Sequence, residues 1–175
     1  MLTKGGNMSL HNHGAAVSGV KSETKMARVI RRKGHIILKT KKDFKKNGVD
    51  EWGTRYHKPP KHWSQKTRTG KQRRFVADGF ILLKNRKNRG IILEQKNSNA
   101  HGTTEEKVFY DLEKIRKGVY GKKHDLWYVF TGKVCHEVEA YKEFEMQAKA
   151  EKLPVKVIFG WEAFEKELEN INGGK

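Results

Sequence analysis

The chain has one cysteine, three prolines and no long apolar run, and these shortages exclude several classes of protein. A lone Cys135 can form neither an internal disulfide nor a zinc site of several thiolates, and it agrees with a reducing compartment. No stretch approaches the roughly 20 apolar residues of a membrane span, and the first residues lack the apolar centre of a signal peptide. We therefore expect a soluble, cytoplasmic protein, and 175 residues suffice for one domain with a real core.

Acidic residues are scarce in the first half of the chain. Residues 21–96 hold 24 Lys and Arg against 6 Asp and Glu, whereas residues 97–175 hold 13 against 14. The net charge of +18 therefore comes almost entirely from one region, and one side of the protein should be strongly positive. Because cations that neutralise phosphates supply most non-specific nucleic-acid affinity, we expect DNA as a partner. A ribosomal-type tail or solubility alone is the alternative.

Composition divides the chain into three segments. Residues 1–24 are rich in Gly, Ser, Asn and His and are expected to be a disordered or loose arm. Residues 25–74 form a basic segment that is expected to contact DNA. Residues 75–175 carry most of the apolar periodicity and are the expected core.

The basic segment has few clear elements. A helical turn should end near Gly34, and residues 35–40 suit either a short strand or a continued helix. Residues 49–73 should be irregular because they include Pro59-Pro60. Aromatic residues there alternate with cations, and they either stack on bases or anchor the loop on the core. The expected DNA-contacting cations are Arg55, Lys58, Lys61, Lys66, Arg68, Lys71 and Arg73.

Residues 74–98 contain two apolar runs that flank a polar, basic connection, which predicts a hairpin. Side chains alternate across a strand, so Glu94 and Lys96 share one face. In an antiparallel hairpin the paired positions have a constant sum. A turn centred on Arg86 therefore places Asp78 opposite Glu94, and a turn centred one residue later places it opposite Lys96. Either register brings the three ionisable groups together.

Helices and strands alternate after the hairpin. Val108, Leu112, Ile115 and Val119 lie at helical spacing, after a capping box that begins at Thr103. A continuous apolar run predicts a strand over residues 126–131. The remaining expected elements are a helix marked by Val138, Tyr141, Phe144 and Ala148, a strand over residues 155–159, and a helix marked by Trp161, Phe164, Leu168 and Ile171. This order predicts an α/β (α+β) fold, in which a mixed sheet opens with a hairpin and is flanked by helices.

Two carboxylates and a lysine beside a cationic surface suit hydrolysis of a phosphodiester. Oxygen ligands select hard cations such as Mg²⁺, which keeps several waters and uses one or two protein carboxylates. Asp78 and Glu94 would hold the ion, and the backbone carbonyl of Gln95 would be a further ligand. Lys96 would position a water or neutralise developing charge. Ser98, two residues further along the same face, either contacts substrate or caps the strand.

The motif Ala77-Asp78-Gly79, followed after a hairpin by Glu94-Gln95-Lys96, resembles the PD-(D/E)XK nuclease superfamily. The resemblance covers residues 74–115 and implies a restriction-endonuclease-like core and divalent-metal-dependent cleavage of DNA. It implies Asp78, Glu94 and Lys96 as catalytic residues and Mg²⁺ as cofactor, with Mn²⁺ as a substitute. Ala77 stands where many members have proline. Many members also use an acidic residue from an N-terminal helix, for which Glu23, Asp43, Asp50 and Glu51 are the candidates.

Two other functions stay open from the sequence. In a non-catalytic nucleic-acid-binding module, Glu94 and Lys96 would form a structural ion pair and Asp78 would close a turn. An RNA-cleaving nuclease would use the same residues on another substrate. Because cutting a duplex usually needs two active sites, we expect a homodimer or a higher homo-oligomer.

Overall fold

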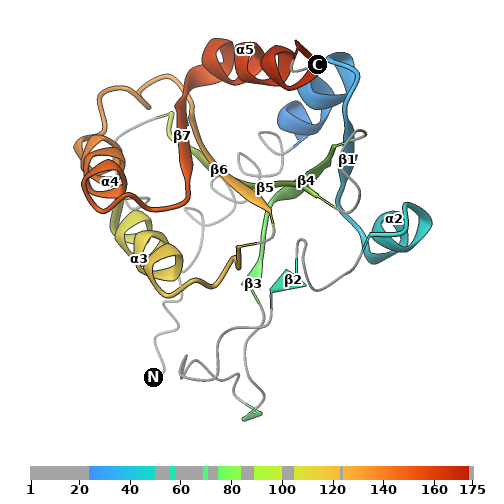
Figure 1. Cartoon of the computed structure of the whole chain (residues 1–175). Helices are drawn as coiled ribbons and strands as arrows, with labels where there is room; N and C mark the ends of the chain where they lie inside the picture. Colours follow the sequence, from blue (N-terminus) through green and yellow to red (C-terminus); the bar gives the residue numbers. More distant parts are fainter. Residues whose placement is uncertain are drawn as a thin grey trace, which may run out of the picture.

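The two hairpin strands lie in the middle of a five-stranded mixed sheet (Figure 1). Strand β4 (Gly79–Leu82) pairs antiparallel with β5 (Gly90–Asn97), and the strand order is β1-β4-β5-β6-β7. Edge strand β1 (Ile36–Leu38) is antiparallel to β4, whereas β6 (Asp125–Thr131) and β7 (Lys156–Phe159) run parallel to β5. The computed structural model describes residues 24–49, 56–57, 69–70, 75–83, 89–99, 105–122 and 124–173.

Helices cover both faces of the sheet. Helices α3 (Glu105–Arg116) and α4 (Glu139–Ala150) lie on one face, and α5 (Gly160–Gly173) lies on the other with the helical residues 24–32 (Figure 1). The expected alternation of helix and strand after the hairpin is therefore confirmed. The predicted mixed sheet flanked by helices is confirmed as well.

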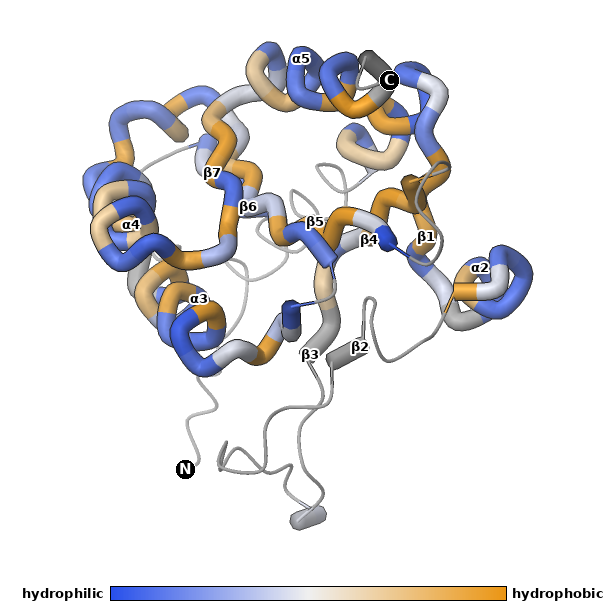
Figure 2. Tube along the Cα trace, viewed as in Figure 1, coloured by the Kyte–Doolittle hydropathy of each residue, from blue (hydrophilic) through white to orange (hydrophobic). Residues whose placement is uncertain are grey.

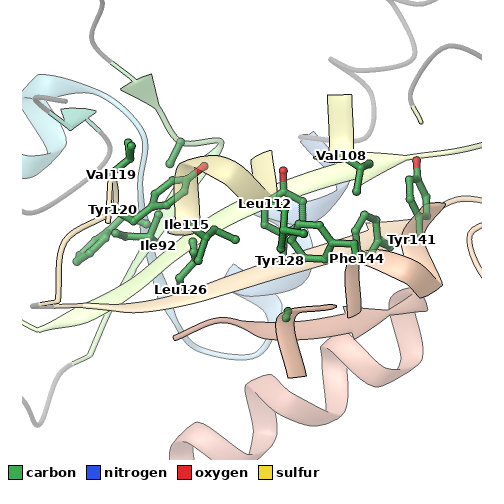
Figure 3. Close-up of a cluster of buried hydrophobic side chains, with 14 of the residues drawn as sticks. Ile92, Val108, Leu112, Ile115, Val119, Tyr120, Leu126, Tyr128, Tyr141 and Phe144 are labelled. Carbon is green, nitrogen blue, oxygen red and sulfur yellow. The ribbon is translucent and has the colours of Figure 1, made fainter. Parts of the chain in front are cut away.

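The sheet separates two hydrophobic cores. Strand β5 contributes to both, because its side chains alternate between the two faces of the sheet. Ile92 faces the core under α3 and α4, which Tyr128 of β6 also joins, and Figure 3 shows this cluster. Leu93 and Val129 face the second core, under α5. Burial on both faces explains why β6 and the first half of β5 are largely apolar, whereas the second half of β5 is polar, and Figure 2 shows both orange and blue along β5.

The described N-terminal residues pack into the same two cores. Met26 is fully buried in the core under α5, and Phe44 of the short helix α2 (Lys41–Lys46) packs on Phe80 with ring centroids 5.6 Å apart. Residues 35–40, which suit a strand or a helix, contain strand β1. Helix α2 was not predicted. A capping box between Thr40 and Asp43 begins it.

The first apolar run of the hairpin forms two strands rather than one. Strand β3 (Phe75–Val76) pairs with β2 (Tyr56–His57) in a separate two-stranded sheet, and the chain bends at Asp78 before β4 begins. The prediction that residues 49–73 are irregular is wrong for β2. Of that segment the structure also describes residues 49 and 69–70, and the others lie outside the described residues, as does the cap at Thr103. The arm expected over residues 1–24 lies outside them as well, except that residue 24 is helical. Within the described part of the chain, no helix has the length and apolar content that crossing a membrane requires.

Close packing at Gly90 generates a stability prediction. A Cβ at position 90 would lie 2.4 Å from the Ile81 carbonyl oxygen and 2.2 Å from Phe80 Cζ, so Gly90→Ala would force β4 and β5 apart. We expect this change to lower the free energy of unfolding by about 3 kcal/mol. A Cβ at position 79 would meet the flexible Ile37 side chain at 3.1 Å. Gly79→Ala should therefore be much milder, and equal losses for the two variants in urea unfolding would contradict this account.

Candidate functional site

The bend between β3 and β4 directs the Asp78 carboxylate at strand β5. The Asp78 backbone N–H donates to the Leu93 carbonyl, with N and O 3.0 Å apart, and continues the β4–β5 ladder by one step. Beyond that point the carboxylate replaces the backbone as a partner, since Asp78 Oδ2 accepts from the Gln95 backbone N–H at 2.7 Å. The departure of the chain toward β3 therefore places an acidic side chain where a sheet partner would continue.

Glu94 lies opposite Asp78 and is buried. Gly79 pairs with Leu93, which is the register of a turn centred on Arg86 and puts position 78 opposite position 94. Only 5% of Glu94 is exposed, and its Oε1 accepts a hydrogen bond from the Tyr120 hydroxyl at 2.9 Å. Burial first, and the nearby Asp78 charge second, raise the pKa of Glu94 to about 8. Asp78 bonds to the backbone on either side of Glu94 and its charge acts on Glu94, so the two acids are neighbours at the end of the hairpin.

Lys96 shares the strand face of Glu94 but pairs with a different acid. Its Nζ lies 2.8 Å from Asp111 Oδ2 and 5.7 Å from the centre of the Tyr128 ring. Burial acts to lower the pKa of Lys96, but the charges of Asp111 and Glu94 outweigh burial and raise this pKa above its ordinary value. Lys96 therefore stays an ammonium ion at neutral pH.

Asp111 of α3 is the residue that the sequence analysis missed. It is 3% exposed, and its carboxylate also contacts the Lys114 ammonium and accepts from the Tyr128 hydroxyl. Burial alone would raise the pKa of Asp111, yet the charges of Lys96 and Lys114 lower it. A signal was present in the sequence, because position 111 follows Val108 by three and so lies on the buried stripe of the helix. An acid on an apolar stripe needs a partner.

These side chains form one electrostatic cluster at one end of the sheet. Three carboxylates, those of Asp78, Glu94 and Asp111, lie among two ammonium groups, those of Lys96 and Lys114, and the charges of the other four groups act on Glu94. Tyr120 and Tyr128 belong to the hydrophobic cluster of Figure 3, and their hydroxyls donate to Glu94 and Asp111.

The donor set at Asp78 and Glu94 fits a hard divalent cation. Burial first, and the Asp78 charge second, make a charged Glu94 unfavourable unless a proton or a cation lies with it. In a strand, the N–H and the C=O of one residue point to the same edge. The Gln95 carbonyl therefore points to the edge where the Gln95 N–H meets Asp78. Two carboxylates and a carbonyl are ligands that Mg²⁺ accepts along with water. No group of three or more His, Cys, Asp and Glu side chains that could hold a metal occurs among the described residues.

No family model, curated protein or solved structure matches this chain. The interpretation of the site therefore rests on the geometry of its own residues.

The other predicted site residues are placed only in part. Ser98 is 5% exposed, and its backbone bonds to Thr131 and Val134 at the end of β6, so contact with substrate stays a prediction. Asp43, a candidate for a fourth acidic site residue, uses its carboxylate to accept from the backbone of Lys39 and Thr40. The expected DNA-contacting cations lie outside the described residues: Arg55, Lys58, Lys61, Lys66, Arg68, Lys71 and Arg73.

The raised pKa of Glu94 predicts how stability depends on pH. Glu94 has a pKa of about 8 in the folded protein against an ordinary value of 4.5, so between these values the folded state binds more protons than the unfolded state. The free energy of unfolding of the metal-free protein should therefore fall as pH rises through this window, by at most about 1.4 kcal/mol per pH unit. Glu94→Gln cannot ionise and should flatten the fall.

Urea unfolding in EDTA at several pH values between about 5 and about 8 measures this effect. The matched control is Glu113→Gln. Glu113 lies on α3 and pairs with Arg116 and Lys117 at the surface, so its replacement should leave the slope of unfolding free energy against pH unchanged. A slope in Glu94→Gln that equals the wild-type slope would show that Glu94 is not the titrating group.

Proposed function

We propose that this protein is a divalent-metal-dependent endonuclease that hydrolyses DNA phosphodiester bonds. The observation that carries the proposal is the position of Asp78 opposite Glu94 across the end of a hairpin, with Lys96 on the same strand face. The proposal includes membership of the PD-(D/E)XK superfamily. Its support is the mixed sheet, in which the antiparallel pair β4–β5 is followed by the parallel strands β6 and β7 with helices on both faces.

Each residue has a separate role in the proposed reaction. Asp78, Glu94 and the Gln95 carbonyl would hold Mg²⁺, with Mn²⁺ as a substitute, beside the part of β5 that extends beyond its pairing with β4. A bound ion would supply Lewis acidity, which lowers the pKa of a water and offsets negative charge on a phosphate. Lys96 supplies a fixed positive charge beside the scissile group. The tyrosines beneath exclude water from the inner side of the cluster and fix the Glu94 and Asp111 carboxylates by hydrogen bonds.

One contact favours the enzyme over the non-catalytic binding module. That module would use Lys96 as the structural partner of Glu94. Among the described residues, the acid within ion-pair distance of Lys96 is Asp111, and Glu94 bonds to a neutral hydroxyl instead. The Asp78–Glu94 pair is therefore not neutralised by an ion pair with this lysine. Acids placed beside a bound phosphate would repel it unless a cation lay between them.

Cleavage of supercoiled plasmid and of branched DNA tests the proposal. We expect the wild-type protein to cut at least one form in Mg²⁺ or Mn²⁺ and to cut none in EDTA. Asp78→Ala should abolish cutting because one of the two metal-holding carboxylates is lost, while Glu113→Gln should cut normally. A homodimer should give linear product, and nicked circles alone would indicate one active site at a time. An RNA substrate run in parallel separates the RNA-cleaving alternative, and no cutting of any nucleic acid would refute the proposal.

Binding and catalysis should be separable by substitution. Lys96→Met should abolish cleavage yet leave salt-sensitive DNA binding nearly intact, because Lys96 is one of 38 Lys and Arg residues in the chain. Replacing Arg55, Lys58 and Lys61 together by alanine should weaken binding and reduce the slope of log affinity against log salt by about 3. Fluorescence anisotropy with a labelled duplex measures both. An unchanged salt slope in the triple variant would show that these three residues do not form the DNA-binding surface.

A further inference from the structure

The ammonium group of Lys96 lies among three carboxylates but is bound by one of them. Lys96 and Glu94 are two residues apart on the same strand face, and the charges of Asp78 and Glu94 both act on Lys96. A lysine side chain is a flexible four-carbon stem that ends in a compact charge, so it can reach more than one nearby partner. In the structure the partner is Asp111, at 2.8 Å. The ammonium is thereby held toward α3.

Asp111 is built to hold a cation in a fixed place. Its carboxylate is almost fully buried, with the side chain 5% exposed. One oxygen meets Lys114, and the other receives both Lys96 and the Tyr128 hydroxyl. Lys114 lies one helical turn after Asp111, so the helix itself supplies the second cation. These contacts fix both the charge and the orientation of Asp111 before any ligand arrives.

An unrestrained Lys96 would interfere with a metal ion. A lysine ammonium and a divalent cation are attracted to the same carboxylate oxygens, and among the described residues the acids whose charges act on Lys96, besides Asp111, are Glu94 and Asp78. If Asp111 lost its charge, the Lys96 ammonium would move toward Glu94 and occupy the place of the cation. Outer groups that orient a metal-binding site typically change metal affinity by about 10- to 100-fold when removed.

We infer that Asp111 is a positioning residue that holds the Lys96 ammonium on the α3 side of the cluster and so keeps the Asp78–Glu94 carboxylates open to a divalent cation. The inference rests on the proposed function for the cation site that it protects. It goes beyond that proposal in assigning a role to a helix residue outside the hairpin motif. It also explains why a lysine so close to two acids pairs with a third one.

Mn²⁺ binding by the full-length protein, followed by electron paramagnetic resonance, tests the inference without any need for cleavage. We expect Asp111→Asn to weaken Mn²⁺ affinity by about 10- to 100-fold. Lys96→Met removes the competing ammonium and should bind Mn²⁺ at least as tightly as the wild-type protein. The double variant should match Lys96→Met to within about three-fold, because Asp111 acts through Lys96 and has no effect once that lysine is absent.

Two controls separate this role from a structural one. Glu113→Gln removes an exposed carboxylate from the same helix and should bind Mn²⁺ like the wild-type protein. Tyr128→Phe removes a hydrogen bond to Asp111 but leaves its charge, so it should weaken Mn²⁺ binding less than Asp111→Asn does. Equal weakening of Mn²⁺ binding in Tyr128→Phe and Asp111→Asn would indicate that Asp111 only supports the packing of the cluster, and the inference would fail.

Each remaining outcome decides the question. Wild-type affinity in Asp111→Asn overturns the inference, and weak binding in the double variant overturns it by making Asp111 itself a ligand. If Asp111→Asn does not fold, Lys96→Met still decides, since affinity below the wild-type value would mean that Lys96 assists the cation. Absence of Mn²⁺ binding by the wild-type protein removes the site and the inference with it. The expected binding pattern without cleavage of any nucleic acid refutes the proposed function alone.

Discussion

The pairing of Gly79 with Leu93 is the contact on which the candidate site depends. This register puts Asp78 opposite Glu94, and a shift by one residue would turn every side chain of β5 to the other face of the sheet. Glu94 would then enter the apolar core under α5, where a buried carboxylate has no partner. Burial of apolar side chains in the two cores therefore selects this β4–β5 register. The register in turn places Asp78 beside Glu94.

The charged cluster is stable because its charges nearly balance. Three carboxylates face two ammonium groups, and burial with the Asp78 charge raises the pKa of Glu94 so that it binds a proton easily. A proton on Glu94 neutralises the excess negative charge at low pH, and a divalent cation would do so at higher pH. Burial raises the free energy of unbalanced charge in the cluster. It also strengthens the attraction of a counter-charge, because electrostatic interactions are stronger away from water.

The hairpin and α3 contribute different charged residues to the cluster because they approach it from different sides. The hairpin supplies the two acids at the point where the pairing of β4 with β5 ends, while α3 supplies Asp111 and Lys114. Lys96 lies between them and is bound from the helix side. A site assembled from two elements that pack through a common core is more rigid than one carried on a loop, and the proposed hydrolysis would need such preorganised charge.

The sequence by itself determined the elements after residue 75 and the common face of Glu94 and Lys96, because strand and helix periodicities are local properties of the chain. It left two registers for Asp78, and it did not predict helix α2, strand β2 or the break between β3 and β4. Only the tertiary structure decided that Asp78 lies opposite Glu94 and that Lys96 pairs with Asp111. These choices depend on contacts between residues distant in sequence, and no local pattern specifies which of several nearby charges a buried lysine will meet.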